Sequence, residues 1–79
     1  MTLRILTPSS GEKSREVTGV FFPGADGSFE VLDSHAPLIA ALGPGLIRWE
    51  CRDGSNGSLA VQDGFVEVKD NKITVTATE

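Results

Sequence analysis

The chain has 79 residues, a formal net charge of −4, and 39% hydrophobic and 23% charged residues. A chain of this length buries only about 60% of the surface that its unfolded form exposes, so we expect one domain, residues 1–79, of modest stability. Its seven lysines and arginines form no basic run, which argues against nucleic acid as a partner.

The first third of the chain contains three expected strands. They cover residues 2–7, 15–22 and 28–32, where apolar residues alternate with polar ones or β-forming residues are frequent. Residues 9–14 are polar and are interpreted as a connector, whereas residues 23–27 are rich in turn formers and predict a hairpin. The strand before this hairpin is apolar on both faces, so we expect both faces to be covered and Phe21 to lie in the core.

The middle of the chain combines a polar corner, a short apolar run and a Gly-Pro-Gly turn. Residues 38–42 are too few for a useful helix, so we expect them to be extended. In Gly43-Pro44-Gly45 the proline fixes its own φ and the glycines permit the dihedral angles of a chain reversal. This predicts a strand–turn–strand unit over residues 35–49. In residues 46–52 every second residue is apolar, which predicts a core face with a large contribution from Trp49 and an inert buried thiol at Cys51.

Three more strands are expected in the C-terminal third. They cover residues 58–62, 65–69 and 72–78, and each is preceded by a turn at 53–57, at Asp63-Gly64 or at Asp70-Asn71. We interpret every glycine as a turn residue. Short strands with frequent turns and no helical periodicity predict an all-β fold, a small and mostly antiparallel β-sandwich or flattened barrel. The expected core consists of Phe21, Ile47, Trp49, Val61, Val66, Val68, Ile73 and Val75.

No candidate for catalysis or metal binding survives a geometric test. Asp33-Ser34-His35 has the residue types of a hydrolytic triad, but consecutive extended residues point in alternating directions and cannot form the hydrogen-bond relay. Asp26, Glu30 and Asp33 lack the spacing of metal ligands. No glycine leads into a helix, so no phosphate loop is expected. We therefore expect no catalytic residue, cofactor or metal, and an interaction module whose contacts lie at residues 33–38, with His35 bonded to a backbone carbonyl or a carboxylate.

The lone Cys51 excludes an intrachain disulfide and favours a reducing compartment. No apolar run approaches the length of a signal peptide or a membrane span. We expect any contact with a membrane to be made through a partner.

Three motifs together resemble a known family. His35-Ala36-Pro37-Leu38, Pro44-Gly45 and the Gly-Phe-Val-Glu-Val run of residues 64–68 resemble the N-terminal β-sandwich domain of the epsilon subunit of F-type ATP synthases, over nearly the whole chain. The resemblance implies a non-catalytic central-stalk (rotor) subunit that binds the gamma subunit and the c-ring. It also implies a role in coupling proton transport to ATP synthesis, and a peripheral location at the cytoplasmic face of the plasma membrane.

The resemblance also implies which residues contact each partner. The corner of His35, Ala36, Pro37 and Leu38 would face gamma, and the turn of Asp26, Gly27 and Ser28 would approach the c-ring. Asp33-Ser34 stands where many relatives have Pro-Gly or Pro-Asn, which affects the shape of the gamma contact. Relatives commonly continue into two C-terminal helices, whereas this sequence ends at Glu79, so either the lineage lacks them or the chain is truncated.

Two other classes of function compete with this assignment. One is a free-standing β-sandwich module that binds a peptide or ligand, and the other is an unrecognised enzyme. A stable stoichiometric complex with a gamma-like coiled-coil subunit would separate the rotor subunit from both.

Overall fold

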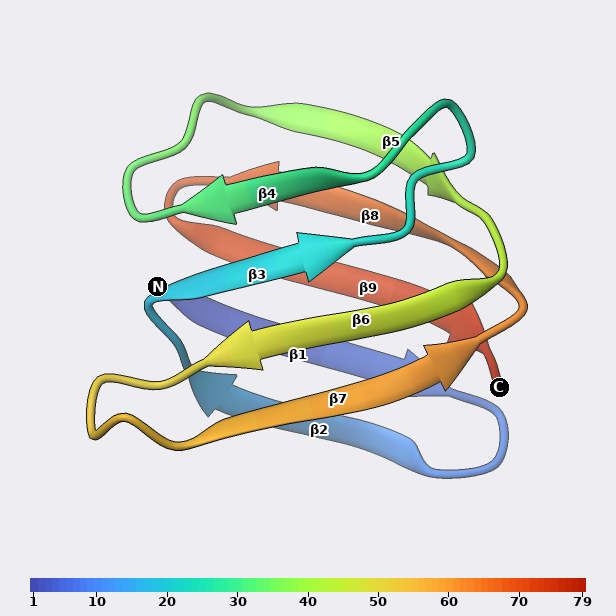
Figure 1. Cartoon of the computed structure of the whole chain (residues 1–79), viewed down its shortest axis with the longest axis horizontal. Coiled ribbons are helices and arrows are strands. Elements are labelled where there is room, and N and C mark those ends of the chain that lie inside the picture. The colour runs from blue at the N-terminus through green and yellow to red at the C-terminus, as the bar shows by residue number, and fades with distance from the viewer.

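The computed structural model describes residues 1–79 as two β-sheets that pack face to face, with no helix, which confirms the all-β expectation (Figure 1). One sheet has five strands in the order β2-β1-β9-β8-β5, and the other has four in the order β4-β3-β6-β7. The strands are β1 Thr2–Thr7, β2 Gly11–Glu16, β3 Gly19–Phe22, β4 Phe29–Leu32, β5 Leu38–Leu42, β6 Gly45–Glu50, β7 Asn56–Val61, β8 Asp63–Lys69 and β9 Lys72–Thr78. Every pairing is antiparallel except that of β1 with β9. No helix is long and apolar enough to cross a membrane.

One apolar core fills the space between the sheets. Alternation along each strand directs every second side chain inward, because successive residues of a strand point to opposite faces. The core consists of Leu3, Ile5, Val17, Val20, Phe22, Val31, Leu42, Ile47, Trp49, Val61, Val66, Val68, Ile73, Val75 and Ala77. Cys51 follows the end of β6, is half-buried against this core and is a free thiol.

Phe21 is the predicted core residue that the structure places elsewhere. Val20 and Phe22 are buried, so Phe21 between them points outward and is 45% exposed. A strand with apolar residues on both faces does not reveal which face is inward. The packing of the other sheet decides it, and the expectation for Phe21 was wrong.

The polar residues 9–14 were expected to be a connector, but most of them belong to a strand. Strand β2 pairs along its whole length with β1, from Thr2 opposite Glu16 to Thr7 opposite Gly11. It is an edge strand and almost wholly exposed, so it carries no apolar alternation, and charged side chains protect its free edge. The run expected as one strand over residues 15–22 is broken between Glu16 and Gly19, where the chain passes from one sheet to the other.

Two predicted reversals are crossings between the sheets. Strands β5 and β6 flank Gly43-Pro44 as expected, but each belongs to a different sheet and they do not pair with each other. Asp63-Gly64 is not a turn, because these residues begin β8 and only Gln62 separates β8 from β7. By contrast, the hairpins β3–β4, β6–β7 and β8–β9 are confirmed.

Glycine is also used inside the strands, against the expectation that each one marks a turn. Gly57 lies in β7 opposite Trp49, and a Cβ atom there would lie 2.6 Å from the indole ring. Gly64 lies in β8, where a Cβ atom would collide with the backbone of β9 at Thr76. Both glycines permit a close approach that any side chain would prevent.

Candidate interaction sites

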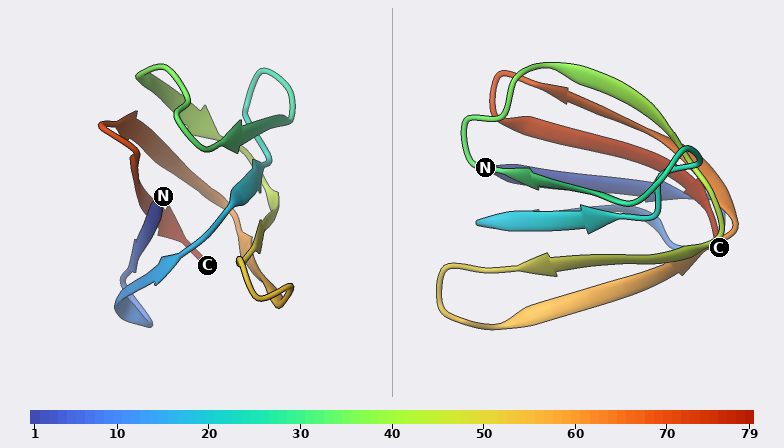
Figure 2. Two further views of the ribbon diagram at one scale, coloured as in Figure 1. Left: turned by 90° about the vertical axis from the view of Figure 1, so that its left-hand side faces the viewer. Right: turned by 45° about the horizontal axis from the view of Figure 1, so that its top comes forward.

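The residues expected to contact partners fall into two groups at opposite ends of the sandwich (Figures 1 and 2). His35, Ala36 and Pro37 lie in the β4–β5 connection, and Leu38 begins β5. This connection lies at the end that carries the N-terminus. Residues 26–28 lie in the β3–β4 loop, at the end that carries the C-terminus. Strand β4 separates the two groups, so they form two sites.

We call residues 33–38 the His35 corner. Ser34 has a left-handed backbone with φ of 63°, which is uncommon for a residue other than glycine. The backbone N–H of His35 donates to the carbonyl of Leu32 at 3.2 Å, and Nδ1 of His35 donates to the carbonyl of Ala36 at 2.7 Å. His35 thus bonds to a backbone carbonyl, as expected.

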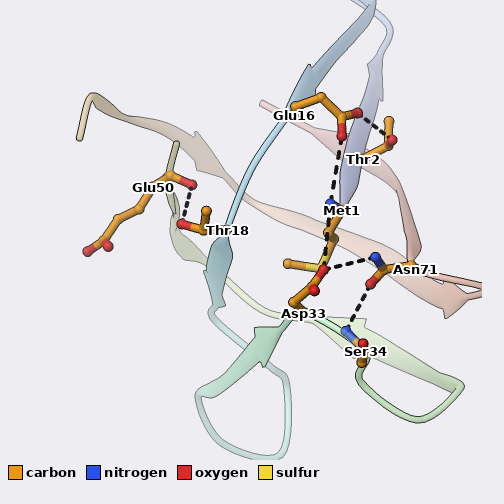
Figure 3. A network of polar contacts seen from close by, with 8 residues as sticks. All are labelled: Met1, Thr2, Glu16, Thr18, Asp33, Ser34, Glu50 and Asn71. Carbon is orange, nitrogen blue, oxygen red and sulfur yellow. Dashed lines mark hydrogen bonds and ion pairs between the residues drawn. The ribbon is translucent and has the colours of Figure 1, made fainter. Parts of the chain in front are cut away.

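The corner is held by a residue from another part of the chain. The side-chain oxygen Oδ1 of Asn71 accepts the Ser34 N–H at 2.9 Å, and Nδ2 of Asn71 donates to Oδ1 of Asp33 at 2.8 Å (Figure 3). The same Asp33 oxygen lies 3.7 Å from the Met1 nitrogen. Sequence reasoning interpreted Asn71 only as a turn residue. It lies 37 residues from Ser34, and no local pattern links the two positions.

The β3–β4 loop has a base, residues 23–25, that is hydrogen-bonded to the rest of the chain, and an exposed tip, residues 26–28. The Ala25 N–H donates to the carbonyl of Ala41 at 2.9 Å, and the Gly43 N–H donates to the carbonyl of Pro23 at 2.8 Å. These bonds tie the base to β5 and to the connection that follows it. Asp26, Gly27 and Ser28 are exposed, and Gly27 has φ of 128°, which favours glycine. An exposed turn on a rigid base is suited to contact another molecule.

Large apolar side chains also lie on the outer faces of both sheets. On the five-stranded sheet Ile39 is 76% exposed and Phe65 is 63% exposed, and Ala41 pairs with Phe65 across β5 and β8. On the four-stranded sheet Phe21 and Leu46 are exposed. Neighbouring exposed apolar groups are typical of contact surfaces. Sequence reasoning expected Phe21 in the core and a mostly polar outer face for residues 46–52, and it identified none of these outer groups.

Hydrogen bonds on the surface stabilise the ionised form of three carboxylates. A side-chain hydrogen bond from Arg4 lowers the pKa of Glu12, and one from Ser55 lowers the pKa of Asp53. Hydrogen bonds from Ser9 and Ser10 lower the pKa of Glu79. No three His, Cys, Asp or Glu side chains lie close enough together to hold a metal ion. Asp33 and Ser34 both bond to Asn71, while the His35 ring bonds to Ala36, so these residues do not form a catalytic relay.

Comparisons with known proteins agree on one family. The family model described as ATP synthase, Delta/Epsilon chain, beta-sandwich domain matches residues 1–79. The ATP synthase epsilon chain of Chlorobium limicola is 46% identical over 70 residues, which is 89% of this chain and 80% of that protein. The epsilon chain of Chlorobaculum tepidum is 41% identical over 78 residues, 99% of this chain and 89% of that protein.

Other relatives are considerably longer than this chain. The epsilon chain of Desulfitobacterium hafniense is 40% identical over 76 residues, which is 96% of this chain but 57% of that protein. Among solved structures, a chain of the Euglena gracilis mitochondrial ATP synthase (OSCP/F1/c-ring) superposes with a TM-score of 0.89 at 21% identity, over 98% of this chain and 49% of that one. A chain of the Tetrahymena thermophila mitochondrial ATP synthase (central stalk/c-ring) gives 0.81 at 18% identity, over 100% and 63%. At these identities the likeness to the solved structures is one of fold.

Proposed function

The chain belongs to the delta/epsilon β-sandwich family of ATP synthase, and from this premise we propose that it is a central-stalk subunit that joins the gamma subunit to the c-ring. The observation that carries the proposal is the match of the family model to all of residues 1–79. The epsilon chains that it matches are named as chains of ATP synthase, and the chain is a non-catalytic subunit of that complex. In this role it helps to couple proton transport to ATP synthesis, as a single epsilon-type domain.

The two separated sites support a role between two partners. A rotor subunit that contacts both gamma and the c-ring needs two surfaces that can be occupied at the same time. The His35 corner and the exposed tip of residues 26–28 lie at opposite ends of one rigid sandwich, so neither partner would block the other. We assign gamma to residues 35–38 and the c-ring to residues 26–28.

The proposal also implies where the protein works. ATP synthase is a membrane-associated complex, and we place this subunit at the cytoplasmic face of the plasma membrane, held there through the complex. The net charge of −4 fits protein partners better than nucleic acid or an anionic lipid surface.

Two charge substitutions test the two sites against each other. His35→Glu introduces a charge at a half-buried position of the corner and should weaken binding to gamma by about 2 kcal/mol or more, roughly 30-fold in Kd. Asp26→Lys should weaken binding to the c-ring and leave the affinity for gamma unchanged. Calorimetry with purified gamma, and co-sedimentation with c-rings in detergent, measure the two affinities.

Each variant is the control for the other, since both leave the core intact. If His35→Glu leaves the affinity for gamma unchanged, the corner is not the gamma contact. If the wild-type chain forms no complex with gamma or with the c-ring, the rotor assignment fails and a free-standing peptide- or ligand-binding module takes its place.

A further inference from the structure

We propose that Asn71 is a positioning residue for gamma binding, which holds the His35 corner in the conformation that gamma recognises. The inference rests on the proposed function of that corner. It adds a residue from the β8–β9 turn, outside residues 33–38, on which the affinity of the corner depends.

The β4–β5 connection has few other constraints. It crosses from the four-stranded sheet to the five-stranded sheet, so no strand pairing extends through it. Its backbone is held locally by the 3.2 Å bond from the His35 N–H to the carbonyl of Leu32 and by the bond from the His35 ring to the carbonyl of Ala36. From outside the connection, the Met1 nitrogen lies 3.7 Å from Oδ1 of Asp33, but it makes no hydrogen bond with the backbone of Ser34. Ser34 also adopts a left-handed conformation that residues other than glycine, asparagine and aspartate seldom adopt. Without an outside contact, other conformations of this connection would compete with the observed one.

Asn71 supplies that contact through both ends of its amide. Its oxygen accepts from the left-handed Ser34, and its nitrogen donates to the preceding residue, Asp33 (Figure 3). The two bonds together fix the Asp33–Ser34 segment that leads directly into His35. An aspartate at position 71 would face the carboxylate of Asp33, and a residue without a polar side chain would make neither bond.

We call the two bonds from Asn71 to Asp33 and Ser34 the clamp. Asn71 itself is anchored on the five-stranded sheet. Asn71 has φ of 61° and Asp70 has φ of 52°, the two left-handed residues of a tight hairpin between β8 and β9. The carbonyl of Asn71 accepts the Thr2 N–H at 3.2 Å, which ties the turn to β1. The position of the corner is therefore set by the sheet through Asn71. Loss of the clamp would lower the fraction of molecules that can bind, and the apparent affinity falls by that fraction.

The first test deletes the clamp and keeps the turn. Asn71→Gly leaves Asp-Gly, which favours the same hairpin turn, so global stability should stay close to that of the wild type. Hydrogen exchange followed by NMR should show faster exchange of the Ser34 amide, and calorimetry should show a loss of about five- to tenfold in the affinity for gamma. Asp70→Asn is the matched control. It changes a charge in the same turn but no contact with the corner, and it should leave both readouts unchanged.

The second test reverses the donor and the acceptor. Asn71→Asp alone places two carboxylates together and should weaken gamma binding. Asp33→Asn alone keeps an acceptor for Nδ2 of Asn71 but removes the charge that faces the Met1 nitrogen, so this single variant is the reference with which the double variant is compared. The double variant Asp33→Asn/Asn71→Asp restores one donor and one acceptor, and it should recover Ser34 protection and affinity. The binding partner is purified gamma, and any purification tag is placed at the C-terminus so that the Met1 nitrogen stays free.

The outcomes separate this inference from the assignment of the corner. If His35→Glu weakens gamma binding while Asn71→Gly changes neither Ser34 exchange nor affinity, Asn71 does not position the corner. If Ser34 exchange rises in Asn71→Gly but the affinity is unchanged, the clamp is real and the positioning role is refuted. If His35→Glu itself has no effect, the corner assignment fails, while Ser34 exchange still reports whether the clamp exists.

Discussion

Gly57→Ala is expected to destabilise the sandwich through a single contact with Trp49. Gly57 in β7 lies directly opposite Trp49 in β6. A Cβ atom at position 57 would lie 2.6 Å from Cε2 and Cζ2 and 2.7 Å from Nε1 of the indole. Displacing the ring has a cost, because it belongs to the core and the Arg15 guanidinium lies over it at 4.5 Å from the ring centroid. The Gly57 backbone is not left-handed, so alanine is permitted there and the packing contact is what the substitution changes.

The expected magnitude combines two opposing terms. Forcing an extra methyl group into a packed site costs about 1–3 kcal/mol, and replacing glycine by alanine in a permitted conformation returns about 0.4–1 kcal/mol through the unfolded state. The midpoints of these two ranges give a net loss of about 1.3 kcal/mol, from a total stability of roughly 4–12 kcal/mol for a chain of this length. At about 4–8 °C per kcal/mol, the melting temperature should fall by about 5–10 °C.

Unfolding followed by tryptophan fluorescence measures this directly, because Trp49 is the single tryptophan of the chain. The native emission of Gly57→Ala should also shift to the red as the indole is displaced toward solvent. Gly19→Ala in β3 is the matched control. Its nearest contact would be the terminal methyl group of the exposed Leu32 side chain at 3.1 Å, which can move aside. Equal stability and unchanged emission in Gly57→Ala would refute the close packing of Trp49 on β7.

Two further predictions concern the core and the response to acid. Phe22→Ala should cost about 3–5 kcal/mol and Phe21→Ala less than about 1 kcal/mol, because only Phe22 is buried; equal losses in a urea titration would contradict the inward direction of Phe22. Hydrogen bonds from Arg4 and Ser55 lower the pKa values of Glu12 and Asp53 in the folded state. The two ionised carboxylates therefore add stability above their usual pKa values of 4.5 and 3.8. This stability is lost as the pH falls through the lowered pKa values of the folded state. Thermal melts across this acidic range should show a small decline that Glu12→Gln reduces, and a melting temperature that rises on acidification would exclude this contribution.

The sequence by itself determined the fold class and most of the strands. Alternation in β1 and β9 directs Leu3, Ile5, Ile73 and Val75 to one face, and these residues are all in the core. The β8–β9 hairpin follows from Asp70-Asn71, two residue types that accept the left-handed conformation. The three motifs at residues 35–38, 44–45 and 64–68 were together sufficient to indicate the family. These features are local, because a strand has a period of two and a turn involves only a few neighbouring residues.

Only the tertiary structure decided which strands share a sheet and which residues meet across it. Strand β2 is almost wholly polar and forms a strand because its backbone pairs with the edge of β1 that would otherwise be free. Gln62 separates two strands of different sheets, Gly57 receives the Trp49 ring, and Asn71 reaches Ser34 across 37 residues. The two predicted contact loops lie at opposite ends of the sandwich because β4 runs between them. The physical reason is that pairing and burial between distant segments depend on the packing of all nine strands at once, which no local pattern of residues encodes.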